Sequence, residues 1–113
     1  MHELSIAMSI VELAEEYAHR EGANHVREME LEVGELSGVV VEALDFAMEE
    51  AVTGTLCEGA RWTIQIVPGE VQCRACGHRF HSRDLFAPCP QCGKAGVEVA
   101  DGEQMRLRSI VVE

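Results

Sequence analysis

Two pairs of cysteines constrain the fold of this chain more than any other sequence feature. The pairs are Cys73-Arg-Ala-Cys76 and Cys89-Pro-Gln-Cys92, each followed by a glycine. Two intervening residues let a tight turn aim both sulfurs at one point, and a second such turn completes a tetrahedron of thiolates. The spacing therefore predicts a metal site with these four cysteines as ligands, and zinc is the metal that best suits such a set.

Other chemistries for the cysteines are two disulfides, a redox dithiol or an iron site. Matched pairs without a secretory context favour metal over bridges. Cys-Pro-x-Cys-Gly also resembles half of a rubredoxin iron site, but the spacer has few aromatic residues to shield a redox centre. Four cysteines fill the shell of a structural zinc, so His78 and His81 are expected to support the ligands from outside or to face solvent. Cys57 stands apart and is expected to be a buried thiol.

The charge balance narrows the classes of partner. The 113 residues carry 20 Asp and Glu against 9 Lys and Arg, a formal net charge of −11. Nucleic-acid binding needs clustered basic residues and is therefore not expected. Membrane insertion is not expected either, because no apolar run approaches about 18 residues. Reduced cysteines and the lack of a signal-peptide pattern at the N-terminus together predict a cytoplasmic protein.

Hydrophobic periodicity predicts the elements outside the cysteine region. Apolar residues recur at helical spacing from Glu3 to about Arg20 and from Val39 to Val52. Alternation of apolar and polar residues predicts strands at His25–Leu36, Arg61–Val67 and from Met105 to Val112. The predicted fold class is α+β: two helices packed on a three-stranded mixed sheet, in the order α-β-α-β-[zinc module]-β.

The zinc module is expected to be an insertion in this fold. Residues 70–102 hold too few apolar side chains to fold without metal, so zinc binding would supply much of their folding energy. We therefore expect residues 1–69 plus 103–113 to form an α/β domain. Residues 70–102 would form a zinc-ribbon-like domain with four cysteine ligands, inserted between the second and third strands. A hinge near Pro68-Gly69 and Ala100–Gly102 would allow the two units to move.

Opposite charges predict which strands are neighbours. A C-terminal strand is not stable alone in water and should rejoin the sheet. Arg106 and Arg108 on this strand would pair with the acidic row of the first strand, which consists of Glu28, Glu30 and Glu32. The row is otherwise expected to be solvated charge, with a docking surface as the alternative.

The start of the chain, Met1-His2-Glu3, is a second candidate metal site. A large second residue generally leaves the initiator methionine in place, so the free amine lies one peptide bond from an imidazole. The amine, the deprotonated His2 amide and the His2 ring can close fused chelate rings, and nitrogen donors suit square-planar Ni(II) or Cu(II). Glu3 or another side chain could complete the coordination. On the residues alone, an inert exposed histidine is the commoner interpretation.

Four motifs spread over the chain are informative together: Met1-His2-Glu3-Leu4-Ser5, Gly34-Glu35-Leu36-Ser37, the double CxxC and Met105-Arg106-Leu107. In this combination the whole chain resembles the HypA/HybF family of hydrogenase nickel-incorporation proteins. The resemblance implies a nickel chaperone that is not an enzyme, with structural Zn²⁺ and transient Ni²⁺. It further implies that His2 is the essential nickel ligand and that Glu3 contributes at the same site.

The resemblance also implies partners. Members of the family act with a HypB-type GTPase to load nickel into the large subunit of [NiFe]-hydrogenase, and the first helix could present one face to the GTPase. A homodimer is compatible with the sequence. The alternative function is a zinc-ribbon module that binds other proteins without handling nickel.

Two positions depart from the family pattern. Some members place an Asp near nickel after the Gly-Glu-x-Ser turn, where this chain has Val39-Val40-Val41, which leaves Glu42 or Asp45 as substitutes. Some members follow both cysteine pairs with histidines, whereas Gly93-Lys94 follows the second pair here. Exchange of a cysteine ligand for histidine is therefore not expected at the second pair, and the remaining nickel ligands stay open.

Overall fold

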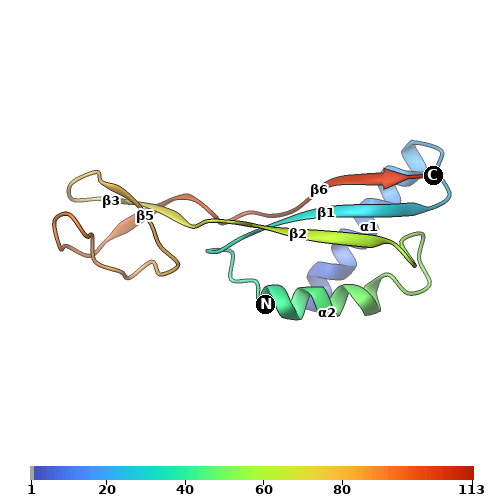
Figure 1. The fold of residues 1–113 in the computed structure, drawn as a ribbon, viewed down its shortest axis with the longest axis horizontal. Coiled ribbons are helices and arrows are strands. Elements are labelled where there is room, and N and C mark those ends of the chain that lie inside the picture. Colours follow the sequence, from blue (N-terminus) through green and yellow to red (C-terminus); the bar gives the residue numbers. More distant parts are fainter. Residues whose placement is uncertain (1) are drawn as a thin grey trace.

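Two three-stranded sheets follow one another along a narrow rod (Figure 1). The computed structural model describes residues 2–113, and the rod measures 55 × 24 × 16 Å. The elements in chain order are α1 (Glu3–Arg20), β1 (Val26–Gly34), α2 (Val41–Ala51), β2 (Arg61–Val67), β3 (Glu70–Cys73), β4 (Arg79–His81), β5 (Val97–Asp101) and β6 (Met105–Val112). Neither helix in the described part of the chain has the length and apolarity needed to span a bilayer.

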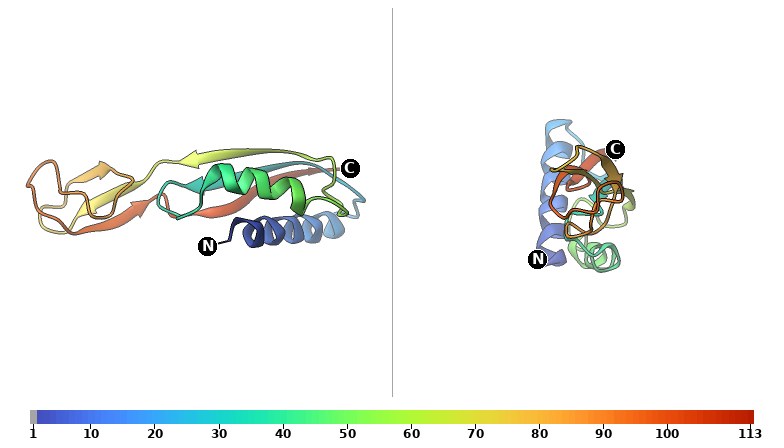
Figure 2. Two further views of the ribbon diagram at one scale, coloured as in Figure 1. Left: turned by 90° about the horizontal axis from the view of Figure 1, so that it is seen from below. Right: turned by 90° about the vertical axis from the view of Figure 1, so that its left-hand side faces the viewer.

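The first sheet has the strand order β2-β1-β6 and carries both helices on one face (Figure 2). β1 is parallel to β2 and antiparallel to β6, so the sheet is mixed. The parallel pair is joined through α2, which is the crossover that such a pair requires. These observations confirm the predicted α+β class with two helices on a three-stranded sheet.

The apolar core lies between this sheet and its helices. Met29, Leu31 and Val33 of β1 are at most 2% exposed and pack with Leu44 and Met48 of α2, which are fully buried. α1 contributes mostly small and β-branched residues to the same cluster: Ala7, Ile10, Val11, Ala14 and Ala18. Small side chains let the helix lie close to its neighbours, and the buried stripe only partly follows the larger apolar residues, since Leu4, Met8 and Tyr17 are exposed.

α1 ends where the sequence predicts a stop. Gly22 has φ +67° and donates its N–H to the carbonyl of His19, while Ala23 donates to the carbonyl of Ala18. This pair of bonds is a Schellman cap, and its positive φ strains any residue with a side chain. The chain then turns directly into β1.

Several boundaries and side-chain positions differ from the sequence-based expectations. α2 begins at Val41 and not at Val39, and the apolar side chain of Val40 is 54% exposed. Val40 is the residue that precedes the first helical turn, and its N–H bonds to the Glu3 carboxylate. Ile66, near the end of β2, is 52% exposed. The first strand ends at Gly34 because the backbone turns there toward α2.

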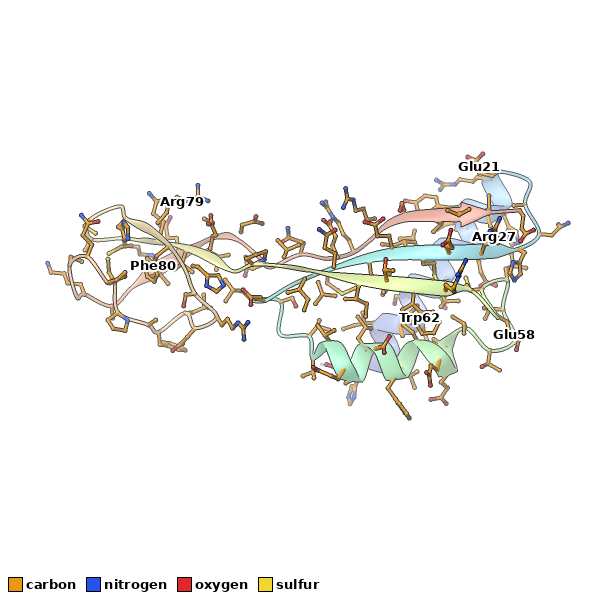
Figure 3. The ribbon with its side chains drawn as sticks, viewed as in Figure 1. Glu21, Arg27, Glu58, Trp62, Arg79 and Phe80 are labelled. Atoms are coloured by element: carbon orange, nitrogen blue, oxygen red, sulfur yellow. The ribbon has the colours of Figure 1, made fainter. Side chains whose placement is uncertain are left out.

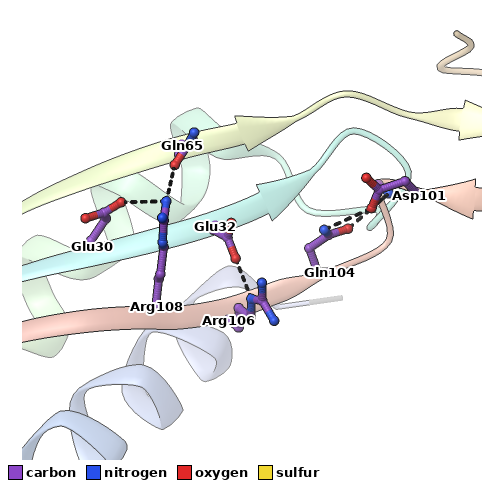
Figure 4. A network of polar contacts seen from close by, with 8 residues as sticks. Glu30, Glu32, Gln65, Asp101, Gln104, Arg106 and Arg108 are labelled. Atoms are coloured by element: carbon purple, nitrogen blue, oxygen red, sulfur yellow. Dashed lines mark hydrogen bonds and ion pairs between the residues drawn. The ribbon is translucent and has the colours of Figure 1, made fainter.

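The predicted pairing of the last strand with the first is confirmed. Arg106 forms an ion pair with Glu32, and Arg108 donates to Glu30 at 3.1 Å and to Gln65 of β2 at 2.9 Å (Figure 4). All three glutamates of the acidic row have basic partners, since Glu28 lies 3.9 Å from the guanidinium of Arg61. The row is thus a neutralised charge ladder, and the Glu32 side chain is only 11% exposed.

The second sheet is small and antiparallel, with the order β4-β3-β5. The chain enters it from β2 through Pro68-Gly69 and leaves it toward β6 through residues 102–104. Val71 in the central strand is fully buried, and the other buried apolar groups of this unit are the sulfurs of Cys73 and Cys89.

Candidate metal centres

The four paired cysteines converge at the far end of the second sheet. Their Sγ atoms all lie within 4.8 Å of one another. Cys73 and Cys92 are 3.6 Å apart, as are Cys76 and Cys89, so each close contact joins one pair to the other. A tetrahedron with Zn–S bonds of about 2.3 Å has edges of about 3.8 Å. The donor set and its size therefore fit zinc, which would hold the two turns together.

The two cysteine turns are built alike. Gly77 donates its N–H to the carbonyl of Cys73 at 2.9 Å, and Gly93 donates to the carbonyl of Cys89 at 2.8 Å. Both glycines have positive φ, +80° and +76°. A residue with a side chain would be strained at either position, so the glycine after each cysteine pair serves its turn.

Backbone N–H groups and neighbouring sulfurs shift the pKa values of the clustered cysteine thiols. The backbone N–H groups of Cys76 and Ala75 lower the pKa of the Cys73 thiol to about 6. The N–H of His78 acts in the same direction on Cys76, but burial and the three neighbouring sulfurs outweigh it and raise the pKa of this thiol to about 12. Four sulfurs so close together cannot all be thiolates without a compensating positive charge, so the cluster calls for a divalent ion.

The histidines near the cluster take different partners. The carbonyl of His78 accepts the N–H of Cys73 at 2.9 Å, and its ring stacks on Phe80, which Figure 3 labels. The ring Nε2 of His81 lies 2.7 Å from the carboxylate of Glu35, in the turn after β1. Neither ring is hydrogen-bonded to a cysteine within residues 2–113, so support of the cluster comes from the His78 backbone.

Cys57 lies outside the cluster, as its sequence position suggested. Its side chain is fully buried in the first core, and burial raises the pKa of its thiol to about 11. A thiol in that state is a poor nucleophile and a poor metal ligand. Cys57 therefore acts as a small apolar group in the core.

The N-terminal candidate site lies at the first turn of α1. Met1, whose amine is one of the expected nickel ligands, lies outside the described residues. His2 is exposed, and its carbonyl accepts the first helical N–H, that of Ile6, at 3.3 Å. The Glu3 carboxylate accepts the N–H of Val40 at 3.3 Å. The segment that carries an Asp in some family members thus does lie beside Glu3.

The two acidic residues suggested as substitutes for that Asp are placed differently. Asp45 accepts the indole N–H of Trp62 at 2.7 Å, and Trp62 points from β2 toward α2 (Figure 3). Glu42 is exposed in the first turn of α2, next to the segment that contacts Glu3. Within residues 2–113 the only group of three or more metal-binding side chains in mutual reach is the cysteine cluster.

A groove beside His2 was not predicted from the sequence. It has a volume of about 620 Å³ and runs between α1 and β6, with His2, Ile6, Tyr17 and Leu107 among its lining residues. Its helical side follows one stripe of α1, which includes Ser5 and Ser9. Only packing of the last strand against the first helix creates it, so no local pattern could have revealed it.

Comparisons with known proteins agree along the whole chain. A family described as "Hydrogenase/urease nickel incorporation, metallochaperone, hypA" matches residues 1–112. The hydrogenase maturation factor HypA of Parabacteroides distasonis is 48% identical over 113 residues, covering 100% of this chain and 98% of that protein. The HypA of Geobacter sulfurreducens is 47% identical over 113 residues, covering 100% of both chains.

The fold has a solved counterpart as well. The solution structure of the Ni metallochaperone HypA from Helicobacter pylori superposes with a TM-score of 0.70 at 29% sequence identity, covering 99% of this chain and 97% of that one. The family description names urease beside hydrogenase, which the motif resemblance did not include. With a match over nearly every residue and relatives at almost half identity, the chain belongs to the HypA family of nickel-incorporation metallochaperones.

Proposed function

We propose that this chain captures Ni(II) at Met1-His2-Glu3 and delivers it to the large subunit of a [NiFe]-hydrogenase during maturation. The observation that carries the proposal is the family match over residues 1–112, which includes the N-terminal motif. The exposure of His2 at the start of α1 supports it, because a cargo site must be open to donor and acceptor. The chain acts as a carrier and not as an enzyme.

Nickel is held by the terminal amine, the His2 amide and the His2 ring. These nitrogens form the fused chelate that square-planar Ni(II) favours. Deprotonation of the amine and the amide makes nickel affinity fall as the pH falls. Because the Glu3 carboxylate accepts the Val40 N–H, its contribution is to seat the chelate against the start of α2.

Zinc has a structural role in the second unit. Cys73, Cys76, Cys89 and Cys92 leave no open position for water or substrate on a tetrahedral ion. The two metals then belong to different domains. Residues 1–69 plus 103–113 form the nickel-binding domain, and residues 70–102 form the inserted zinc domain. His78 supports the cluster from outside, whereas His81 belongs to the junction between the two units.

The delivery step involves partner proteins. A HypB-type GTPase docks on α1, the helix that begins at His2, and transfer takes place in the cytoplasm. The groove between α1 and β6 supports this assignment, since it opens beside His2 and is lined largely by apolar side chains. The net charge of −11 favours a partner with a basic surface and makes nucleic acid an unsuitable one.

A titration with Ni(II) tests the proposal. The protein must carry its native N-terminus, since a tag would move the amine away from the chelate. We expect His2→Ala to lose most nickel affinity and to abolish hydrogenase maturation, with zinc content unchanged. His19→Ala is the matched control, because His19 is an exposed histidine at the other end of the same helix. Equal nickel binding by His2→Ala and His19→Ala would refute the proposal and favour the zinc-ribbon interaction module.

A further inference from the structure

One carboxylate joins the two sheets. Glu35 follows β1, and its side chain is only 11% exposed. It accepts the N–H of Gly69 at 2.8 Å, lies 2.7 Å from Nε2 of His81 and accepts from Nε of Arg83 at 2.6 Å. Gly69 is in the connection between the sheets, and the other two donors belong to β4 and the loop after it. A side chain of the first unit therefore holds two points of the second unit and one point of the connection that leads into it.

The connecting backbones touch at glycines. A Cβ on Gly34 would lie 1.9 Å from the carbonyl oxygen of Gly102, and a Cβ on Gly69 would lie 2.3 Å from that of Ser82. Gly102 also has φ +99°, and a Cβ there would lie 2.7 Å from the Cα of Gly69. The glycines that suggested a hinge are thus required for close approach of three chain segments.

Backbone hydrogen bonds fix the same junction. Leu36 donates to the carbonyl of Gly102 at 2.8 Å, and Ser82 donates to that of Gly69 at 3.0 Å. Glu35 itself donates to the carbonyl of Val67 at the end of β2, at 2.9 Å. The Glu35 turn is therefore tied to the chain that enters the second sheet and to the chain that leaves it.

The charge of Glu35 strengthens these contacts. The Gly69 N–H, the His81 ring and the Arg83 guanidinium lower the pKa of the carboxyl to about 2. Hydrogen bonds to an ionised acceptor are about twice as strong as neutral ones, and a half-satisfied buried carboxylate is costly. Because His81 and Arg83 belong to the second unit and Gly69 to the connection, bending the rod at this point would take partners away from the carboxylate.

We propose that Glu35 is a positioning residue that clamps the zinc unit at a fixed angle to the first sheet, so that the N-terminus and the cysteine cluster move as the two ends of one rigid rod. The clamp is a property of the folded chain without nickel. It rests on the proposed function only for the identity of the two metals.

The clamp is tested in zinc-loaded, nickel-free protein with Glu35→Gln. Glu32→Gln is the matched control, since Glu32 is also 11% exposed and paired with an arginine, but lies within the first sheet. In Glu35→Gln only, we expect nitrogen-15 relaxation to give residues 70–101 a rotational correlation time that differs from that of the first sheet. Exchange of the Gly69 amide should become about 10- to 100-fold faster, as loss of a charge-assisted hydrogen bond predicts.

The two donors provide a second variant. His81 and Arg83 are 56% and 78% exposed, so replacing both with glutamine removes the two side-chain donors of the second unit without disturbing the core. We again expect different rotational correlation times for the second unit and the first sheet. Zinc content and the spectrum of the cobalt-substituted cluster should stay unchanged. Rigid tumbling of the whole rod in Glu35→Gln, or in the double variant if Glu35→Gln does not fold, would overturn the proposal.

Discussion

The two ends of the molecule are stabilised by different means. The first sheet and its helices share one cluster of buried residues that draws on α1, β1 and α2. The second sheet buries one valine, Val71, and two of its cysteine sulfurs. Apolar burial stabilises a unit by itself, whereas a unit with so little buried surface depends on cross-links. The comparison teaches that in this chain a hydrophobic core stabilises the end with the two helices, whereas the end with the four cysteines depends on its metal.

Removal of zinc is the strongest way to test this difference. A structural zinc contributes on the order of 10 kcal/mol to a small unit. We expect chelation, or Cys89→Ser, to abolish amide protection in residues 70–101 while the first sheet still unfolds cooperatively. Hydrogen exchange measured by mass spectrometry reports both regions at once.

The control for this experiment is a cysteine outside the cluster. Cys57→Ala should retain one zinc and the protection of the second sheet, because Cys57 is buried in the first core. Loss of the first sheet on chelation, to the same extent as the second, would mean that the metal stabilises the whole rod and would break the comparison.

A cavity in the first core is the converse test. Leu44 is fully buried between α2 and the sheet, so Leu44→Ala should lower the free energy of unfolding of the first unit by about 3 kcal/mol. Phe46 on the same helix is 75% exposed, and Phe46→Ala should change it by less than about 0.5 kcal/mol. Urea denaturation gives both values. Zinc content should be the same in the two variants, and equal destabilisation by both would contradict the assigned core.

The contrast between the two ends also explains what the sequence could predict. Cysteine spacing is a local signal, and it identified the four clustered residues. Charge complementarity between Arg106, Arg108 and the acidic row correctly predicted that the last strand lies beside the first. Helix and strand periods located most of the core, although the apolar side chains of Val40 and Ile66 proved to be exposed.

Features formed by distant residues could not be predicted. Gly34-Glu35 was recognised as a motif, but Gly69, His81 and Arg83, the donors to Glu35, lie 34 to 48 residues further along the chain. The groove beside His2 likewise needs β6 to lie against α1. Such features depend on which segments pack together, and no periodicity within a single segment encodes that.

The smallest expected effect is at the junction, where protonation of Glu35 would release one end from the other. The folded pKa of about 2 is below the ordinary value of 4.5, so the carboxylate stabilises the clamped state fully above about pH 4.5. This contribution is lost as the pH falls from there toward 2. Since the clamp sets an angle and not a fold, its loss should loosen the rod while both units stay folded.

A carboxyl carbon-13 titration of Glu35 measures this effect where zinc is still bound. We expect the shift of Glu35 to stay flat between pH 7 and about pH 5, because a group with a pKa of about 2 is almost fully ionised throughout that range. In the variant with both His81→Gln and Arg83→Gln, two of the three donors are gone, so the same carbon should begin to titrate near the acid end. Identical curves in the two proteins would show that His81 and Arg83 do not hold the carboxylate, and the junction would then depend on its glycine contacts alone.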